Sequence, residues 1–123
     1  MKKLFISTAL LLLIPIFSFG YLKYLSNSCD KLTSEFETVL LIAGSENATV
    51  KFEEAEKDWE KYEKFFAVSV NHTELDSVKQ SIIRAGSYLK SGDKTELSCE
   101  LSVIISLIKH IKELEYPNLQ NMF

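Results

Sequence analysis

A chain of 123 residues is long enough for one domain with one hydrophobic core. It has 14 basic and 17 acidic side chains, and only Lys2 and Lys3 precede residue 23, so residues 23–123 carry 12 basic against 17 acidic groups and a net charge of −5. This balance argues against nucleic-acid binding, which needs a basic face, and against a polybasic lipid-binding surface.

The segment from Leu4 to Leu22 contains no charged residue. It is about as long as the roughly 20 apolar residues that cross a bilayer as one helix. Lys2 and Lys3 stand before it, and this position of positive charge predicts a cytoplasmic amino terminus. We therefore predict a single-pass signal anchor over residues 1–22 and an extracytoplasmic domain over residues 23–123.

Two alternatives to an uncleaved anchor remain open at this point. Ser18-Phe19-Gly20 is an acceptable cleavage site for a secretory signal. Lipid attachment at Cys29 is disfavoured, because the preceding Ser26-Asn27-Ser28 offers no large aliphatic residue. An uncleaved helix is favoured because apolar residues continue past the segment at steps of three and four, which is typical of one helix face. These residues are Leu22, Leu25, Cys29, Leu32, Phe36, Val39 and Ala43.

The first helix is expected to run to about Ile42 and to end with Gly44 as a left-handed cap. A second amphipathic helix begins near residues 47–49, and its charged residues form a solvated face. Its apolar stripe consists of Phe52, Ala55, Trp59, Tyr62 and Phe66.

A third helix is predicted to start at Asn71, whose side chain caps it while Glu74 reaches back to form a capping box. Val70 and Leu75 stand at the positions of a hydrophobic staple around this cap. Gly92 ends the helix. Its stripe consists of Leu75, Val78, Ile82, Ala85 and Leu89.

Asp93 and Glu96 predict the start of a fourth helix, and Pro117 predicts its stop. Its stripe of Leu97, Leu101, Ile104, Ile108 and Ile111 is widened by Val103, Leu107 and Leu114. The apolar tail residues Leu119, Met122 and Phe123 are expected to fold back onto the domain. Short connections between helices favour antiparallel neighbours, so the expected fold is all-α: a transmembrane helix that continues into an up-and-down helical bundle.

The chain resembles a family of small single-span membrane-anchored proteins of unknown function from Gram-positive, spore-forming bacteria. The resemblance lies in Trp59 within a charged helix, the stretch 71–76 (Asn-His-Thr-Glu-Leu-Asp), Tyr88-Leu89 before Gly92-Asp93-Lys94, and the ending Asn118-x-x-Asn121-x-Phe123. It implies an extracytoplasmic helical domain in the bacterial cell envelope. It implies no known activity and transfers no catalytic residue.

His72, Glu74, Asp76 and His110 are the candidate metal ligands. If the third and fourth helices pair about the Gly92 turn, Glu74 and His110 lie at the same level. Two histidines with carboxylates can bind zinc, but no His-Glu-x-x-His signature is present. Helix capping and solvent exposure are therefore the preferred interpretation, and we expect no metal site and no cofactor.

The sequence contains no Gly-x-Ser-x-Gly elbow and no phosphate-binding glycine loop, so we expect no catalytic residue and no enzyme activity. Cys29 and Cys99 are predicted to lie too far apart in an up-and-down bundle for a disulfide. The preferred functional hypothesis is a membrane-anchored bundle that binds or positions another envelope protein. The alternative is a ligand- or metal-sensing module that uses the membrane-proximal end of the bundle, which contains His72 and His110.

Overall fold

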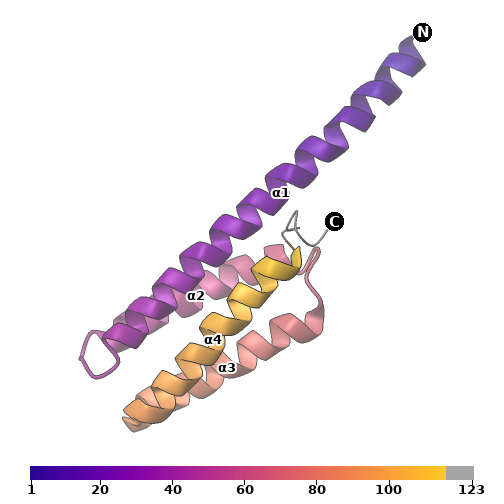
Figure 1. The fold of residues 1–123 in the computed structure, drawn as a ribbon. Coiled ribbons are helices and arrows are strands. Elements are labelled where there is room, and N and C mark those ends of the chain that lie inside the picture. Colours follow the sequence, from indigo (N-terminus) through magenta and orange to yellow (C-terminus); the bar gives the residue numbers. More distant parts are fainter. Residues whose placement is uncertain (116–123) are drawn as a thin grey trace.

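The computed structural model describes residues 1–115, and these residues form four helices and no strand. The helices, labelled in Figure 1, are α1 (Lys2–Leu41), α2 (Ala48–Phe66), α3 (His72–Ser91) and α4 (Lys94–Glu115). This architecture confirms the all-α prediction.

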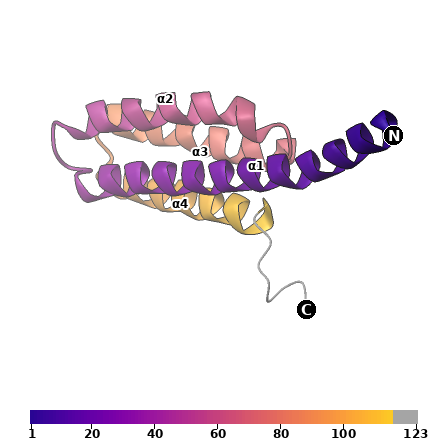
Figure 2. The same ribbon diagram turned by 90° about the horizontal axis from the view of Figure 1, so that it is seen from above.

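The four helices form a closed ring in which each packs against two others. Helix α1 contacts α2 and α4, and α3 contacts the same two helices from the opposite side. Consecutive helices run in opposite directions, and the amino-terminal half of α1 projects alone from one end (Figures 1 and 2). The predicted up-and-down bundle, entered by a long apolar helix, is therefore present.

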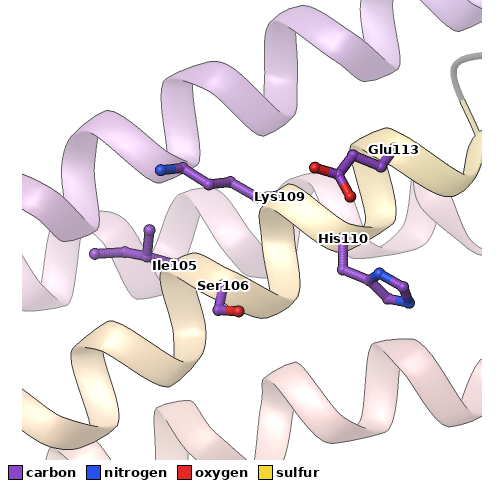
Figure 3. A pocket seen from close by; sticks show the side chains of 5 residues that line it. All are labelled: Ile105, Ser106, Lys109, His110 and Glu113. Atoms are coloured by element: carbon purple, nitrogen blue, oxygen red, sulfur yellow. The ribbon is translucent and has the colours of Figure 1, made fainter. Parts of the chain in front are cut away.

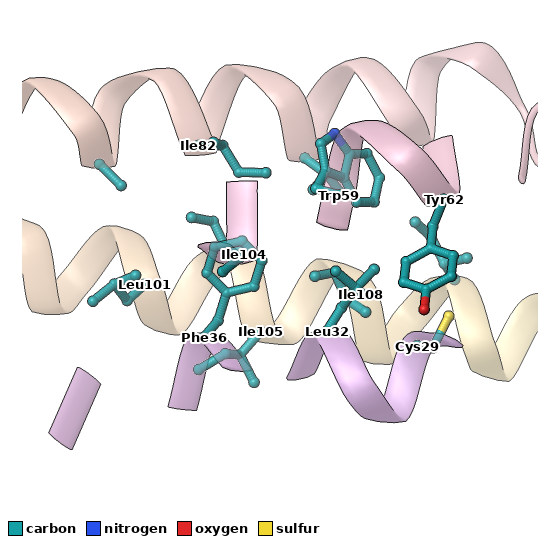
Figure 4. Close-up of a cluster of buried hydrophobic side chains, with 14 of the residues drawn as sticks. Cys29, Leu32, Phe36, Trp59, Tyr62, Ile82, Leu101, Ile104, Ile105 and Ile108 are labelled. Atoms are coloured by element: carbon teal, nitrogen blue, oxygen red, sulfur yellow. The ribbon is translucent and has the colours of Figure 1, made fainter. Parts of the chain in front are cut away.

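The core of the bundle is built from the predicted apolar stripes. Side chains from all four helices meet in it (Figure 4), and Phe36 of α1 lies edge-on to Phe52 of α2 with ring centroids 6.4 Å apart. Full burial of such a side chain contributes about 1.5–3 kcal/mol relative to exposure. The largest fully buried side chains are Trp59, Phe36, Phe66, Leu25, Leu32, Leu75, Leu97, Leu101, Ile104, Ile108, Ile111 and Val39.

Helix α4 departs from the predicted pattern at its flanks. Val103 and Leu114 are 43% and 57% exposed, whereas Ile105, which lies outside the predicted stripe, is 8% exposed. The reason is that α4 contacts both α1 and α3, so its buried arc turns toward α1 at Ile105.

The helix ends confirm four predicted signals. The side chain of Asn71 accepts a hydrogen bond from the Thr73 N–H at 2.9 Å, and Asp93 accepts one from the Glu96 N–H at 3.1 Å. Gly92 adopts φ +75°, and the Asp93 N–H donates to the Tyr88 carbonyl, which completes a left-handed helix end. Val70 and Leu75 are both buried around the Asn71 cap, as a hydrophobic staple requires.

The predicted left-handed cap at Gly44 is wrong. Helix α1 ends at Leu41, and Gly92 is the one residue with positive φ in the described part of the chain. The chain turns instead through a hydrogen bond from the Ser45 N–H to the Ile42 carbonyl. A Cβ at Gly44 would lie 3.3 Å from Lys94 Nζ, so the glycine leaves room for a crossing side chain.

The predicted stop at Pro117 and the predicted docking of Leu119, Met122 and Phe123 lie outside the described residues.

Candidate functional site

The structure brings together one pair of the four candidate metal ligands. Glu74 lies in the first turn of α3 and His110 near the end of α4, and Glu74 Oε1 is 3.9 Å from His110 Nε2. The two residues therefore share a level, as the pairing of the third and fourth helices about Gly92 predicts. The His110 side chain is 51% exposed, and an ion pair at such a site contributes little, about 0–1 kcal/mol when the imidazole is protonated.

His72 and Asp76 do not join this pair to make a metal site. His72 is exposed at the start of α3, and Asp76 lines a hollow between α3 and α4 together with Arg84. No group of three or more His, Cys, Asp or Glu side chains that could hold a metal ion occurs among residues 1–115. Asn71 caps α3 alone, and the Glu74 side chain faces His110 rather than the helix start.

An open hollow of about 400 Å³ lies along the outer face of α4. It is lined by Ile105, Ser106, Lys109, His110 and Glu113, which all come from this one helix (Figure 3). Lys109 extends toward Glu37 of α1 at 3.7 Å, while His110 extends toward Glu74 of α3. Lys109 and His110 therefore point toward different helices, and they do not converge on a common ligand in this hollow.

A pair of carboxyl groups between α1 and α2 was not predicted from the sequence. Lys31 Nζ lies 3.8 Å from Glu35 Oε1 and 3.6 Å from Asp58 Oδ2. The other Glu35 oxygen is buried without a hydrogen-bond partner among the described residues. Loss of hydration, and then the neighbouring Asp58 carboxyl, raise the pKa of Glu35 to about 7. In the sequence both acids fit the solvated faces of their helices, and only the register of α1 against α2 brings them together.

An aromatic cluster lies where α1 leaves the bundle. The ring of Phe65 stacks on Tyr21 at 4.7 Å and meets Tyr24 edge-on at 4.4 Å. The Tyr21 hydroxyl lies 2.7 Å from Ser69 Oγ, and it donates to the Phe65 carbonyl at 3.3 Å. We call the end of the bundle that contains Tyr21, the α2–α3 connection (residues 67–71) and the end of α4 at Glu115 the exit end. The contacts of Tyr21 join the α2–α3 connection to α1 there.

The two cysteines occupy different environments. Cys29 is 1% exposed in the core, close to Tyr62 in Figure 4, whereas Cys99 is exposed on α4. Both thiols are free. Burial, followed by the negative charge of Asp30, raises the pKa of the Cys29 thiol to about 12, so it behaves as a small apolar core residue.

The first half of α1 is apolar and lies outside the bundle. Every side chain from Met1 to Gly20 is exposed, and α1 is the one helix in residues 1–115 that is long and apolar enough to cross a bilayer. The first residue that packs against the core of the bundle is Tyr21. The membrane span from Leu4 to Leu22 and the domain boundary after it stay predictions.

One known family of proteins matches the part of the chain that forms the bundle. A family model described as a domain of unknown function, DUF4363, matches residues 19–122. The match begins at Phe19, two residues before the first packed residue, so the family domain corresponds to the bundle and leaves most of the apolar half of α1 outside. No curated protein and no solved structure matches this chain. Because the family model covers most of the sequence, the chain belongs to the DUF4363 family.

Proposed function

We propose that this protein is a single-pass, membrane-anchored helical bundle that holds a binding surface for another envelope protein close to the membrane. The observation that carries the proposal is the division of α1 into two halves. Its first half exposes apolar side chains on every face, and its second half supplies Leu25, Leu32 and Phe36 to the core. One uninterrupted helix of 40 residues joins them, so the bundle is attached rigidly rather than by a flexible linker.

The proposed orientation has a cytoplasmic amino terminus and the bundle outside. Lys2 and Lys3 before the apolar segment support it. The sequence resemblance to small single-span membrane-anchored proteins of unknown function supports the same compartment. Membrane fractionation at the full, uncleaved mass, with the bundle accessible to protease from outside, is the expected result. Release of a protein that begins at Tyr21 would refute the anchor.

A protein partner is supported by apolar side chains left exposed on the bundle. Ile83 is 58% exposed beside a groove between α2 and α3, and Val103 is 43% exposed beside the hollow between α3 and α4. The groove between α2 and α3 has a volume of about 350 Å³, with Phe52 and Gly86 among its lining residues. We propose a non-enzymatic role in which these faces contact the partner.

Site-specific photocrosslinking in intact cells tests the partner. A photoreactive residue at position 83 or 103 should give one discrete adduct, and the same residue at Lys79, which is exposed on α3, serves as the control. Adducts that appear equally at position 79, or at no position, would count against partner binding at these faces.

The second candidate function, a ligand or metal sensor at the exit end, is favoured by the contact of Glu74 with His110. Those two groups are one short of the three protein ligands of an open zinc site. Zinc titration of the full chain and of His110→Ala distinguishes the two functions. Binding that the substitution abolishes supports the sensor, and no binding by the full chain excludes a zinc sensor at this pair.

A further inference from the structure

The exit end of the bundle and the apolar half of α1 meet without a spacer. Gly20 is exposed, and the next residue, Tyr21, already packs against the core. At about 1.5 Å per residue, the segment Leu4 to Leu22 is about 28 Å long. The hydrocarbon core of a bilayer is about 30 Å thick. A bilayer spanned by this segment therefore places the exit end at the level of the lipid headgroups.

The side chains at the exit end suit that level. Tyr21 and Tyr24 present aromatic rings with polar hydroxyls, the type of side chain enriched at membrane interfaces. Val68, in the α2–α3 connection, is 77% exposed, and Tyr24 is 44% exposed. An apolar side chain this exposed in water is stabilised when it enters an apolar or interfacial layer.

The α2–α3 connection is held in position for such a contact. The hydrogen bond between Tyr21 and Ser69 joins the connection to α1, and the hydrogen bond from Tyr21 to the Phe65 carbonyl joins the adjacent end of α2 to α1. Figures 1 and 2 both show the connection beside the point where the free half of α1 leaves the bundle. Its height above the membrane is therefore set by the anchor helix itself.

The net charge of the domain indicates what kind of contact the exit end makes with the membrane. Residues 23–123 carry a net charge of −5, which opposes electrostatic adsorption to anionic headgroups. The side chains proposed to meet the lipid, Val68, Tyr21 and Tyr24, are aliphatic or aromatic. Their binding should therefore depend on apolar insertion and should persist when salt screens charge.

We propose that the α2–α3 connection is a lipid-docking site, in which Val68, with Tyr21, Tyr24 and Phe65 around it, inserts into the headgroup layer of the bilayer that α1 spans. This inference rests on the membrane anchor proposed above. It adds that the exit end of the bundle touches the membrane surface, and that the α1–α2 and α3–α4 turns at the other end point away from the membrane.

Depth-dependent fluorescence quenching tests the proposal. Single cysteines are introduced at Val68, Leu11 and Leu41 in full-length Cys99→Ser protein, since Cys29 is buried. The labelled proteins are reconstituted into phosphatidylcholine vesicles that contain some phosphatidylglycerol. Lipids with a quencher on the headgroup should remove most of the emission at position 68, and mid-chain quenchers should remove most of it at position 11. The label at Leu41, 87% exposed at the opposite end of the bundle, should lose none.

The outcomes separate the two claims. An unquenched label at position 11 refutes the anchor. A quenched label at position 11 with an unquenched label at position 68 refutes docking and leaves the anchor standing. Quenching at position 68 that disappears in 1 M salt, where the Debye length is about 3 Å, also overturns insertion, because it indicates an electrostatic contact. A label at exposed Ala67, in the same connection, should be quenched in the same way as the label at position 68. Unchanged far-UV circular dichroism of each labelled protein shows that the label has not damaged the fold.

Discussion

Glu35 should make the stability of the bundle fall as pH rises, and Glu35→Gln should remove this dependence. Burial first, and then the Asp58 carboxyl, raise the pKa of Glu35 from its ordinary 4.5 to about 7, against the opposing effect of Lys31. Glu54 adds a smaller effect in the same direction as Asp58. The folded state thus binds the proton more tightly than the unfolded state. The resulting stability is complete below about pH 4.5 and is lost as pH rises to about 7.

The magnitude follows from the size of this shift. At about 1.36 kcal/mol for each pKa unit, it corresponds to at most about 3 kcal/mol. The Glu35 side chain keeps 23% exposure and one oxygen faces Lys31, so solvent screening reduces the effect to roughly 1–2 kcal/mol. For a domain of about 100 residues, that free energy corresponds to roughly 5–15 °C in melting temperature.

The assay is thermal unfolding of the full chain in a non-ionic detergent between about pH 5 and pH 8, followed by far-UV circular dichroism. Exposed Glu53→Gln on α2 serves as the matched control. The melting temperature of Glu35→Gln should exceed that of the parent at the upper end of this range and converge with it at the lower end. Parallel profiles for the parent and Glu35→Gln would show that Glu35 does not hold the proton near neutral pH.

Three further predictions concern the core, the turns and the thiols. Phe36→Ala should cost about 3–5 kcal/mol of unfolding free energy, because it leaves a cavity between α1, α2 and α4; a loss below about 1 kcal/mol would contradict this packing. Gly92→Ala should lower the melting temperature through about 1–2 kcal/mol of left-handed strain, whereas Gly86→Ala, whose Cβ meets Phe52 at an ordinary 3.5 Å, should leave it unchanged or raise it. Unreduced native protein should react with a thiol reagent at Cys99 alone, and unfolded protein should react at two thiols; a single modified thiol after unfolding would contradict the free state of both.

The fold was predictable because the sequence of each helix contains its own apolar stripe, which can be identified without the other helices. Apolar residues at steps of three and four identify the buried faces, and all five stripe residues of α2 are buried. Gly92 and Gly44 show the limit of reading single residues. Both follow a helix, but only Gly92 adopts positive φ, because the α1–α2 turn is closed by ordinary backbone conformations from Ile42 to Ser45.

The candidate site was predictable only where a short turn fixes the register of two helices. Glu74 and His110 lie on α3 and α4, which are joined at Gly92, so counting residues from the turn places them together. Glu35 and Asp58 depend on how α1 rotates and slides against α2 across a longer connection. The sequence pattern does not specify that relation, because a charged residue on a helix flank looks the same whether a neighbouring helix covers it or water does.

The closed ring of contacts has a consequence for the order in which the chain folds. Helix α1 is the first to be synthesised, yet one of its two packing partners is the last helix, and Lys112 pairs with Asp30 across 82 positions at 2.7 Å. Until α4 arrives, the stripe of α1 that includes Phe36 and Val39 has only α2 to cover it. Bringing α4 back to α1 closes a long loop, and the conformational entropy that this costs is lost before the α1–α4 contacts can form. A chain that stops before α4 therefore leaves the apolar faces of α1 and α3 exposed to water. Such truncated products should be prone to aggregation and proteolysis.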